Sequence, residues 1–474
     1  MIKVYLDWNV MSGMKNKYFP DLTEIISNRD KFLLVYSTSH IGDIFASIKN
    51  NSAEEQNLVR EDLEFISSLT DNLCLANDSK EVTLGIYDPG ELLDDRISEA
   101  HLFKNLSLDS LFDSIELDNP MYGIGEVMKN MIASIPLDSA FKEAFQDPET
   151  AKTLEELFPG LKDDLTMKGF FNSFGKMLDN MNEGEGYKDL RSIVQQVGIS
   201  NGHFSQDKKP FDVIDNAYKK KGMENFEAGN YFDKNKNAPD WFNDIINEYV
   251  SLDMHGFKAD KIKVTDKENN TFRNTTEDAQ HSAFASRCDF YVTNDDKNYH
   301  KTKAVYQKLG VSTKVLKPNE FVQYYNSFLT FNTFEEHFES IIDEYKKTDN
   351  YHEQKYENGE SFGLVKLTNQ YFFNFFNKLL VPYPEPNGAL FILSKESPAN
   401  KYIIHSWEIE GMIKLFADKF GPDIDGKCFY EVSEISTEDD WMGRTWHLNI
   451  GQINIRRIRG WFHLYFYQIE NQED

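Results

Sequence analysis

Short apolar runs that end in a polar or acidic residue, alternating with amphipathic helices, constrain this chain more than any other feature. The first strand is expected at Ile2–Leu6 and the second at Phe32–Tyr36. Helices are expected between and after them, at Asp21–Asn28 and at His40–Lys49, where apolar residues recur at helical spacing. Strands that alternate with helices predict a parallel sheet whose faces are covered by helices.

The same alternation continues to residue 88 and returns near residue 276, so the sheet is predicted to be built from two separated halves, residues 1–88 and 270–327. The first half closes with a helix at Ala53–Leu69 and a strand at Asn72–Ala76. The second half is expected to contain, in order, a helix at Glu277–Arg287, a strand at Asp289–Thr293, a helix at Tyr299–Leu309, a strand at Ser312–Leu316 and a helix at Pro318–Tyr325.

Residues 89–269 separate the two halves and contain no clear strand pattern, which predicts a mainly helical insertion. Helices are expected at Ala151–Leu157, Gly169–Met181 and Trp241–Leu252, with polar loops near Asn201–Pro210 and Gly229–Asn237.

Residues 328–474 predict a separate α+β domain of unknown role. Helices are expected at Phe334–Lys346 and Glu408–Phe420. Strands are expected at Gly363–Leu367, Ala389–Leu393, Cys428–Val432, Trp446–Ile455 and Trp461–Ile469, the last two as a hairpin around Arg459-Gly460.

Composition narrows the class of protein. The 474 residues are 40% hydrophobic and 14% aromatic, which indicates a folded chain. A formal net charge of -27 argues against general coating of DNA. It leaves two interpretations: a nucleic-acid enzyme with local basic patches, or a protein that does not meet nucleic acid. Three widely separated cysteines argue against a disulfide framework and a structural zinc site. No signal peptide or apolar run of about 20 residues is evident, so a cytoplasmic location without membrane contact is expected.

Four aspartates stand where the predicted strands end or the following helices begin. Asp7 ends the first strand, Asp43 lies in the first turn after the second, Asp278 opens a helix, and Asp295 follows the strand after it. The carboxyl ends of parallel strands share one edge of a sheet, where ligands bind. Four carboxylates at close quarters need a compensating cation. Hard divalent cations take oxygen ligands and can activate water for attack on a phosphodiester.

The segments YLDWNV, STSHIGDI and EDAQHSAFASRCDFYVTNDD resemble the PIN domain, a family of Mg²⁺- or Mn²⁺-dependent nucleases that usually act on RNA. Asp7, Asp43, Asp278 and Asp295 match the four acids of that family in order, and the resemblance implies that they are catalytic and hold the metal. The matched segments lie within residues 1–88 and 270–325, about a third of the chain.

Neighbouring residues are assigned with less specific roles. Asn9 and Thr293 match the supporting polar residues of the family, and Asp296 is a possible additional metal ligand, although a solvated turn acid is the simpler interpretation. His281 lies three residues after Asp278 on the same helix face. It is either a residue that supports the metal or substrate phosphate, or a core histidine. Trp8, where the family usually has Thr or Ser, and the long insertion depart from the family pattern.

The last predicted strands carry arginines between aromatic residues, a combination that suits single-stranded nucleic acid. Arg444, Arg456, Arg457 and Arg459 are therefore candidates for nucleic-acid binding; a solvated strand face with ordinary core aromatics is the alternative. Basic pairs also occur in the insertion, at Lys208-Lys209 and Lys219–Lys221.

The sequence therefore predicts a metal-dependent endonuclease, with an endoribonuclease that uses Mg²⁺ or Mn²⁺ on single-stranded RNA as the leading hypothesis and DNA as the other candidate substrate. A regulatory protein partner and a toxin or defence role are suggested by the resemblance alone. The alternative is a PIN-like module that has lost catalysis and serves for binding or as a scaffold.

Overall fold

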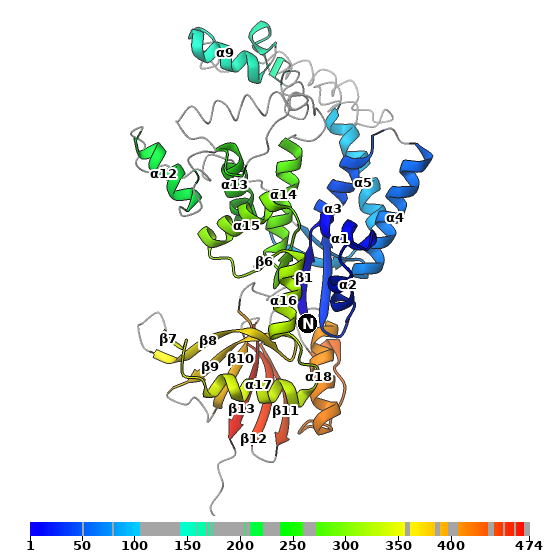
Figure 1. Cartoon of the computed structure of the whole chain (residues 1–474), viewed down its shortest axis with the longest axis vertical. Helices are drawn as coiled ribbons and strands as arrows, with labels where there is room; N and C mark the ends of the chain where they lie inside the picture. The colour runs from blue at the N-terminus through cyan, green and yellow to red at the C-terminus, as the bar shows by residue number, and fades with distance from the viewer. Residues whose placement is uncertain are drawn as a thin grey trace, which may run out of the picture.

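A computed structural model of the chain contains two sheets with helices packed on them (Figure 1). It describes residues 1–49, 52–77, 80–104, 143–158, 160–166, 169–170, 173, 204, 209–220, 238–258, 272–355, 361–383, 389–396, 406–434, 440–448, 451–458 and 461–468. None of the helices within these ranges combines the length and apolar character needed to cross a membrane.

The first sheet has six strands and is parallel except at one edge. Across the sheet they lie in the order β4 (Val82–Ile86), β3 (Leu73–Asn77), β2 (Phe32–Ser37), β1 (Ile2–Leu6), β5 (Phe290–Val292) and β6 (Lys314–Leu316). β1 pairs in parallel with both β2 and β5, while β4 pairs antiparallel with β3. In chain order, β2, β3 and β4 follow one another on one side of β1, whereas β5 and β6 lie on its other side. The strand order therefore reverses between β1 and β5.

Helices cover both faces of this sheet, because alternate strand residues point to opposite faces. One face holds Tyr5 and Tyr291, and the other holds Val4 and Leu6. The helices of the sheet domain are α1 (Trp8–Lys15), α2 (Pro20–Ile26), α3 (Thr38–Ser47), α4 (Ala53–Thr70), α5 (Pro89–Lys104), α12 (Pro210–Lys220), α13 (Asp240–Met254), α14 (Phe272–Ala285), α15 (Asp296–Leu309) and α16 (Pro318–Phe328). α9 (Pro148–Leu157) and a 3-10 turn (Leu161–Asp163) lie in the range assigned to the insertion.

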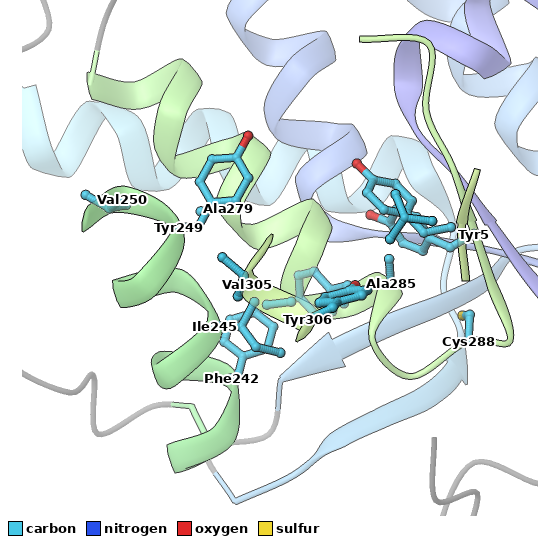
Figure 2. Packing of buried hydrophobic residues seen from close by; sticks show 14 of the residues in the cluster. Tyr5, Phe242, Ile245, Tyr249, Val250, Ala279, Ala285, Cys288, Val305 and Tyr306 are labelled. Carbon is cyan, nitrogen blue, oxygen red and sulfur yellow. The ribbon is translucent and has the colours of Figure 1, made fainter. Parts of the chain in front are cut away.

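α13 also lies within that range, yet it packs into the core of the sheet. Figure 2 shows Phe242 and Ile245 of α13 beside Val305 and Tyr306 of α15, and Tyr249 of α13 beside Ala279 of α14. Tyr249 and Val305 are fully buried. The insertion therefore contributes to the covering of one face of the parallel sheet.

The second sheet has seven antiparallel strands, and α17 (Phe334–Lys346) and α18 (Ser406–Phe420) pack with it. Its strands lie in the order β11 (Trp441–Leu448), β12 (Gly451–Ile458), β13 (Trp461–Gln468), β10 (Ala389–Ser394), β9 (Phe376–Pro382), β8 (Ser361–Phe372) and β7 (His352–Lys355). A short 3-10 turn (Val432–Glu434) precedes β11.

Two buried ion pairs join the domain of the parallel sheet to the domain of the antiparallel sheet. Lys3 of β1 donates to Glu408 of α18 at 2.9 Å, and Lys395, just after β10, donates to Asp289 at 2.7 Å. Asp289 directly precedes β5 and also accepts a hydrogen bond from the backbone N–H of Lys3 at 2.8 Å. All four side chains are buried. These pairs lie at the amino ends of β1 and β5, opposite the edge where Asp7 and Asp295 lie.

The mixed α/β class and the parallel sheet with its helices are confirmed, as are the helices at Ala151–Leu157 and Trp241–Leu252. Sequence analysis missed α1, α5, α12, β4, β7 and β9. Its strand at Cys428–Val432 is wrong, since this segment has no strand partner and Phe429 is 83% exposed. The strand at Trp446–Ile455 is also wrong, since it joins the end of β11 to the start of β12. Most of the helix at Gly169–Met181, nearly all of both polar loops and the turn at Arg459-Gly460 lie outside the described residues.

Candidate metal centre

The candidate site lies at the carboxyl edge of the parallel sheet, where β1 and β5 are neighbours. Leu6 pairs with Val292, and the backbone N–H of Asp7 donates to the carbonyl of Val292 at 2.9 Å. Asp7 and Thr293 therefore leave their strands side by side. This is the point at which strand order reverses, and open α/β sheets bind ligands at such points.

Asp7 is 3% exposed and is held by three side chains. Its Oδ2 atom accepts hydrogen bonds from Asn9 Nδ2 at 2.8 Å, Thr293 Oγ1 at 2.6 Å and Asn298 Nδ2 at 3.3 Å. The side-chain oxygen of Asn9 in turn accepts from the backbone N–H of Asn294 at 3.0 Å. These bonds fix the orientation of the carboxylate and leave its Oδ1 atom as the one for a further ligand.

Asp43 and His281 complete a cluster with Asp7. Each of the three residues offers one ligand atom, and these atoms lie within 4.8 Å of one another. Nε2 of His281 lies 2.9 Å from Oδ2 of Asp43. The two residues come from α3 and α14, which approach closely at Gly42: a Cβ atom there would lie 2.5 Å from the carboxylate of Glu277. Glu277 is buried and paired with Arg96.

A buried chain of hydrogen bonds orients the His281 ring. Nδ1 of His281 lies 2.7 Å from the hydroxyl of Tyr5, which lies 2.6 Å from Oγ of Ser37. When Nε2 binds Asp43 or a metal, Nδ1–H can donate to Tyr5, and Tyr5 can donate to Ser37. Histidine ligands of metals are commonly fixed by such a partner on the other ring nitrogen.

His40 ties the ends of β1 and β2 together beneath this chain. Its Nδ1 accepts from the backbone N–H of Ser37 at 3.0 Å, so its Nε2 carries the proton and donates to the carbonyl of Leu6 at 2.8 Å. Burial and the nearby charge of His281 lower the pKa of His40 well below its usual value. His40 is therefore neutral, and its role is to position the two strand ends.

Asp278 was expected to open a helix, which is wrong: α14 begins at Phe272, so Asp278 lies in its middle, one turn before His281. It is partly buried, but it is not one of the three residues that meet within 4.8 Å. Burial raises its pKa well above the usual value, and repulsion from Asp7, Asp43 and Asp295 adds to this, with Lys301 opposing. The carboxyl of Asp278 therefore feels the charges of all three other predicted acids. A cation among them would relieve this repulsion.

Asp295 and Asp296 are both exposed and stand apart from the cluster. Oδ1 of Asp295 caps α15, accepting from the backbone N–H groups of Lys297 and Asn298 at 2.7 Å each. Asp296 forms an ion pair with Lys317 at 2.7 Å. Asp295 is therefore held in place with one oxygen free of the cap, whereas Asp296 is directed to Lys317.

Charge at the cluster is balanced in part by His281. Burial lowers the pKa of His281, but the charge of Asp43, the hydrogen bond to it and the charge of Asp7 outweigh burial and raise the pKa to about 9. Burial raises the pKa of Asp7, while His281 and the hydrogen bond from Thr293 oppose the rise. At neutral pH the imidazolium is thus the cation that faces these two carboxylates, and a metal that used Nε2 would replace its proton.

The donor set fits a divalent cation. Carboxylate oxygens suit Mg²⁺ and Mn²⁺, while imidazole suits transition metals. Two carboxylates with one imidazole therefore favour Mn²⁺ over Mg²⁺ if His281 is a ligand. Asp7 and Asp43 would hold the ion directly, and Asp278 and Asp295 lie near enough to interact with it electrostatically.

The predicted nucleic-acid arginines do not form one surface. Arg444 is buried, and its Nε, Nη1 and Nη2 atoms donate to Glu434, to Asp423 and to the carbonyl of Phe429. Arg457 is buried as well. Buried side chains cannot contact a phosphate backbone at these positions, so the structure gives no support to nucleic-acid binding by either residue.

The other two arginines differ from these. Arg456 is partly exposed and lies over the ring of Tyr465 at 4.2 Å. Arg459 lies outside the described residues.

Four residues of the site went unnoticed in the sequence: Tyr5, Ser37, His40 and Asn298. In the sequence, Tyr5 resembles an ordinary buried strand residue, and Ser37 and His40 resemble the first residues of a helix. Indeed Ser37 does cap α3. Asn298 follows Asp295 by three residues, the spacing of one helical turn, which is the one signal that could have indicated it.

Comparisons with known proteins give no relative. No protein-family model, no curated protein and no solved structure matches the chain.

Proposed function

We propose that this protein is a PIN-like, metal-dependent endoribonuclease whose centre is formed by Asp7, Asp43 and His281, with Asp278 and Asp295 around them. The observation that carries the proposal is the meeting of three ligand atoms within 4.8 Å at the carboxyl edge of a parallel sheet. Their place at the reversal of strand order, between β1 and β5, adds support.

A bound Mg²⁺ or Mn²⁺ would activate water and stabilise the charge that develops on the phosphodiester. The residues of the chain have separate tasks. Asn9, Thr293 and Asn298 hold one oxygen of Asp7, so its other oxygen is presented to the ion. Tyr5 orients His281, and the cap of α15 keeps Asp295 at the rim. In-line attack by water would leave a 5′-phosphate and a 3′-hydroxyl.

The test is cleavage of end-labelled single-stranded RNA, with single-stranded DNA of the same sequence alongside, in Mn²⁺, Mg²⁺ or EDTA. We expect cleavage in Mn²⁺, less in Mg²⁺ and none in EDTA. Asp7→Asn should lower the rate by about 10–100-fold, because it removes the negative charge of a metal ligand. Asp21→Asn, an exposed first-turn acid of α2, is the matched control and should cleave as wild type does. Cleavage that persists in EDTA would overturn the proposal.

The second candidate is a PIN-like binding or scaffold module without catalysis. It is favoured by one observation: His281 already supplies a cation to the acidic cluster, with a pKa raised to about 9. This candidate predicts that purified protein binds neither Mn²⁺ nor Mg²⁺ at neutral pH. It further predicts RNA binding that is the same in Mn²⁺ and in EDTA, with no product in either.

A further inference from the structure

A groove of about 990 Å³ lies beside the free edge of β6. Three parts of the chain form its walls: the segment before α12, the residues after α13, and one side of α15 with β6. Lys209 and Lys258 come from the range assigned to the insertion, whereas Lys303 and Lys314 come from the sheet domain. The groove therefore exists only because the insertion folds against α15 and β6.

The lining of this groove is basic, although the protein as a whole is strongly acidic. Four lysines and His300 line it, although the ammonium of Lys314 lies over the rings of Tyr324 and Tyr371 rather than in the groove. None of the described residues that line it is an aspartate or glutamate. The chain has 78 acidic and 51 basic residues, so this surface reverses the overall balance. Burial and the charges of Lys258, Lys317 and Lys303 lower the pKa of His300, with Asp296 opposing, which indicates a positive potential here.

One helix connects the groove to the candidate metal centre. His300, Lys303 and Gln307 lie along a single face of α15, spaced by three and four residues. The same helix begins directly after Asp295, its N-cap. At 1.5 Å per residue, Lys303 lies about 12 Å along the helix from Asp295. A few nucleotides span this distance at about 3.4 Å or more each.

The groove also offers apolar and aromatic surface. Phe204 and Phe257 line it and contact each other edge to face, with ring centroids 5.3 Å apart. Nucleic-acid grooves for single strands combine cations that follow the backbone with rings on which bases stack. The edge of β6 that pairs with no described strand could instead accept a peptide strand. However, β6 has only three residues, begins with Lys314 and is followed by Lys317, features that discourage strand addition.

We propose that this groove binds the phosphate backbone of single-stranded RNA and leads it along α15 to the acidic edge of the sheet. The inference rests on the proposed nuclease function and gives the insertion a part in it. Lysines at the groove would supply the attraction for RNA that a net charge of -27 otherwise opposes. The groove would thus hold nucleotides next to the scissile bond, outside the metal centre.

The experiment measures RNA binding in EDTA, so that neither metal nor cleavage enters. The probe is a fluorescein-labelled single-stranded RNA of about 16 nucleotides, with DNA of the same sequence in parallel. Anisotropy titrations over a range of salt compare wild type with Lys258→Glu/Lys303→Glu. The matched control is Lys219→Glu/Lys220→Glu, which changes the charge equally at two exposed lysines of α12 that do not line the groove.

We expect the groove variant to bind RNA about 10-fold or more weakly at moderate salt. Its slope of log K against log salt should be shallower by about 1.4, since each lost phosphate contact removes about 0.7. The control should stay within about 2-fold of wild type. Because lysine contacts the phosphate, which RNA and DNA share, the affinity for DNA should fall by about the same factor as the affinity for RNA. Three results would overturn the inference. The salt dependence of RNA binding could be the same in the groove variant as in wild type, the control could lose as much RNA affinity as the groove variant, or the groove variant could lose affinity for only one of RNA and DNA.

Cleavage of short and long RNA distinguishes failure of the proposed RNA-binding groove from failure of the proposed nuclease function. With Mn²⁺ present, the groove variant should still cleave a dinucleotide, which is too short to reach from the centre to Lys303, while it cleaves long RNA poorly. Loss of cleavage on both lengths would show that the substitutions disturb the centre and would count against the groove. RNA binding by wild type without any cleavage would reject the proposed function alone.

Discussion

Nε2 of His281 lies 2.9 Å from Oδ2 of Asp43, so an imidazole from the second half of the sheet and a carboxylate from the first half share one proton or one ion. This pair bridges 238 positions of sequence. A metal ion and a proton therefore compete for Nε2 of His281.

Binding of Mn²⁺ should release protons. The pKa of His281 is raised to about 9, so at neutral pH the ring is charged, and Nε2 can bind an ion only after it loses its proton. Affinity for Mn²⁺ should therefore rise as pH increases from about 7 to about 9 and then level off. Calorimetry in buffers of different ionisation enthalpy would measure the released protons. The same experiment on His281→Gln should show a weaker dependence on pH.

Asp278→Asn should stabilise the metal-free protein. Burial and three nearby carboxylates raise the pKa of Asp278, so folding disfavours its charged form; this cost grows as pH rises above the ordinary pKa of 3.8 and is complete above the raised pKa of the folded state. We expect the free energy of unfolding at pH 8 to rise by about 1–2 kcal/mol, with the gain vanishing in acid. Denaturant unfolding at pH 5 and pH 8 measures this. A variant that is less stable than wild type at pH 8 would show that Asp278 is favourably paired.

Gly42→Ala should disturb the contact between α3 and α14. The added Cβ would lie 2.5 Å from the buried carboxylate of Glu277, so either this side chain, which pairs with Arg96, or the two helices must shift; a shift of α3 would move Asp43. We expect a loss of about 1–3 kcal/mol in stability and weaker Mn²⁺ binding. Gly411→Ala on α18 is the control: nothing lies within 4 Å of its Cβ, and it should gain about 0.5–1 kcal/mol. Equal Mn²⁺ affinity in Gly42→Ala and wild type would contradict the proposed approach of the two helices.

Asp295→Ser should separate capping from catalysis. Serine is as good an N-cap as aspartate, so the stability contributed by the cap of α15 should change by only a few tenths of a kcal/mol. Asp295→Ala should cost about 1 kcal/mol, because the N–H groups of Lys297 and Asn298 lose their acceptor. If Asp295 also assists the metal, both variants lose cleavage of RNA. Full activity in the serine variant would limit Asp295 to the cap.

Arg444→Ala should act on folding alone. Its guanidinium holds buried Asp423 and partly buried Glu434, and loss of one partner of a buried ion pair leaves the other charge uncompensated. We expect a loss of about 3 kcal/mol or more in stability. RNA affinity of the protein that remains folded should not change. A specific loss of RNA affinity without loss of stability would restore Arg444 as a nucleic-acid residue.

Local pattern was sufficient for much of the fold and for part of the site. The strand at Ile2–Leu6 was evident from its apolar run, and Asp7 from its place at the end of it. Such predictions succeed because strand ends and helix starts depend on neighbouring residues. Asp43 was expected in the first turn of its helix, which is wrong: α3 begins at Thr38, so Asp43 lies in the second turn.

Which of Asp278 and His281 faces Asp43 could not be predicted in the same way. The two residues lie one turn apart on α14, so a small rotation of the helix about its axis decides between them. That rotation depends on packing against α3, α13 and α15, which are distant in sequence. The grouping of the groove lysines could not be predicted for the same reason. Lys209 was evident as part of a basic pair, but the four lysines come from separate segments that meet only in the folded chain.

The ion pairs of Lys3 with Glu408 and of Asp289 with Lys395 affect how any shortened protein should be interpreted. β1 and β5 each have a buried charge at one end and a residue of the metal centre at the other. A fragment that stops before the second sheet would leave Lys3 and Asp289 without their partners at the base of those strands. Loss of activity in such a fragment would therefore report a disturbed sheet rather than the removal of a regulator, and the smallest unit for enzymology is the whole chain.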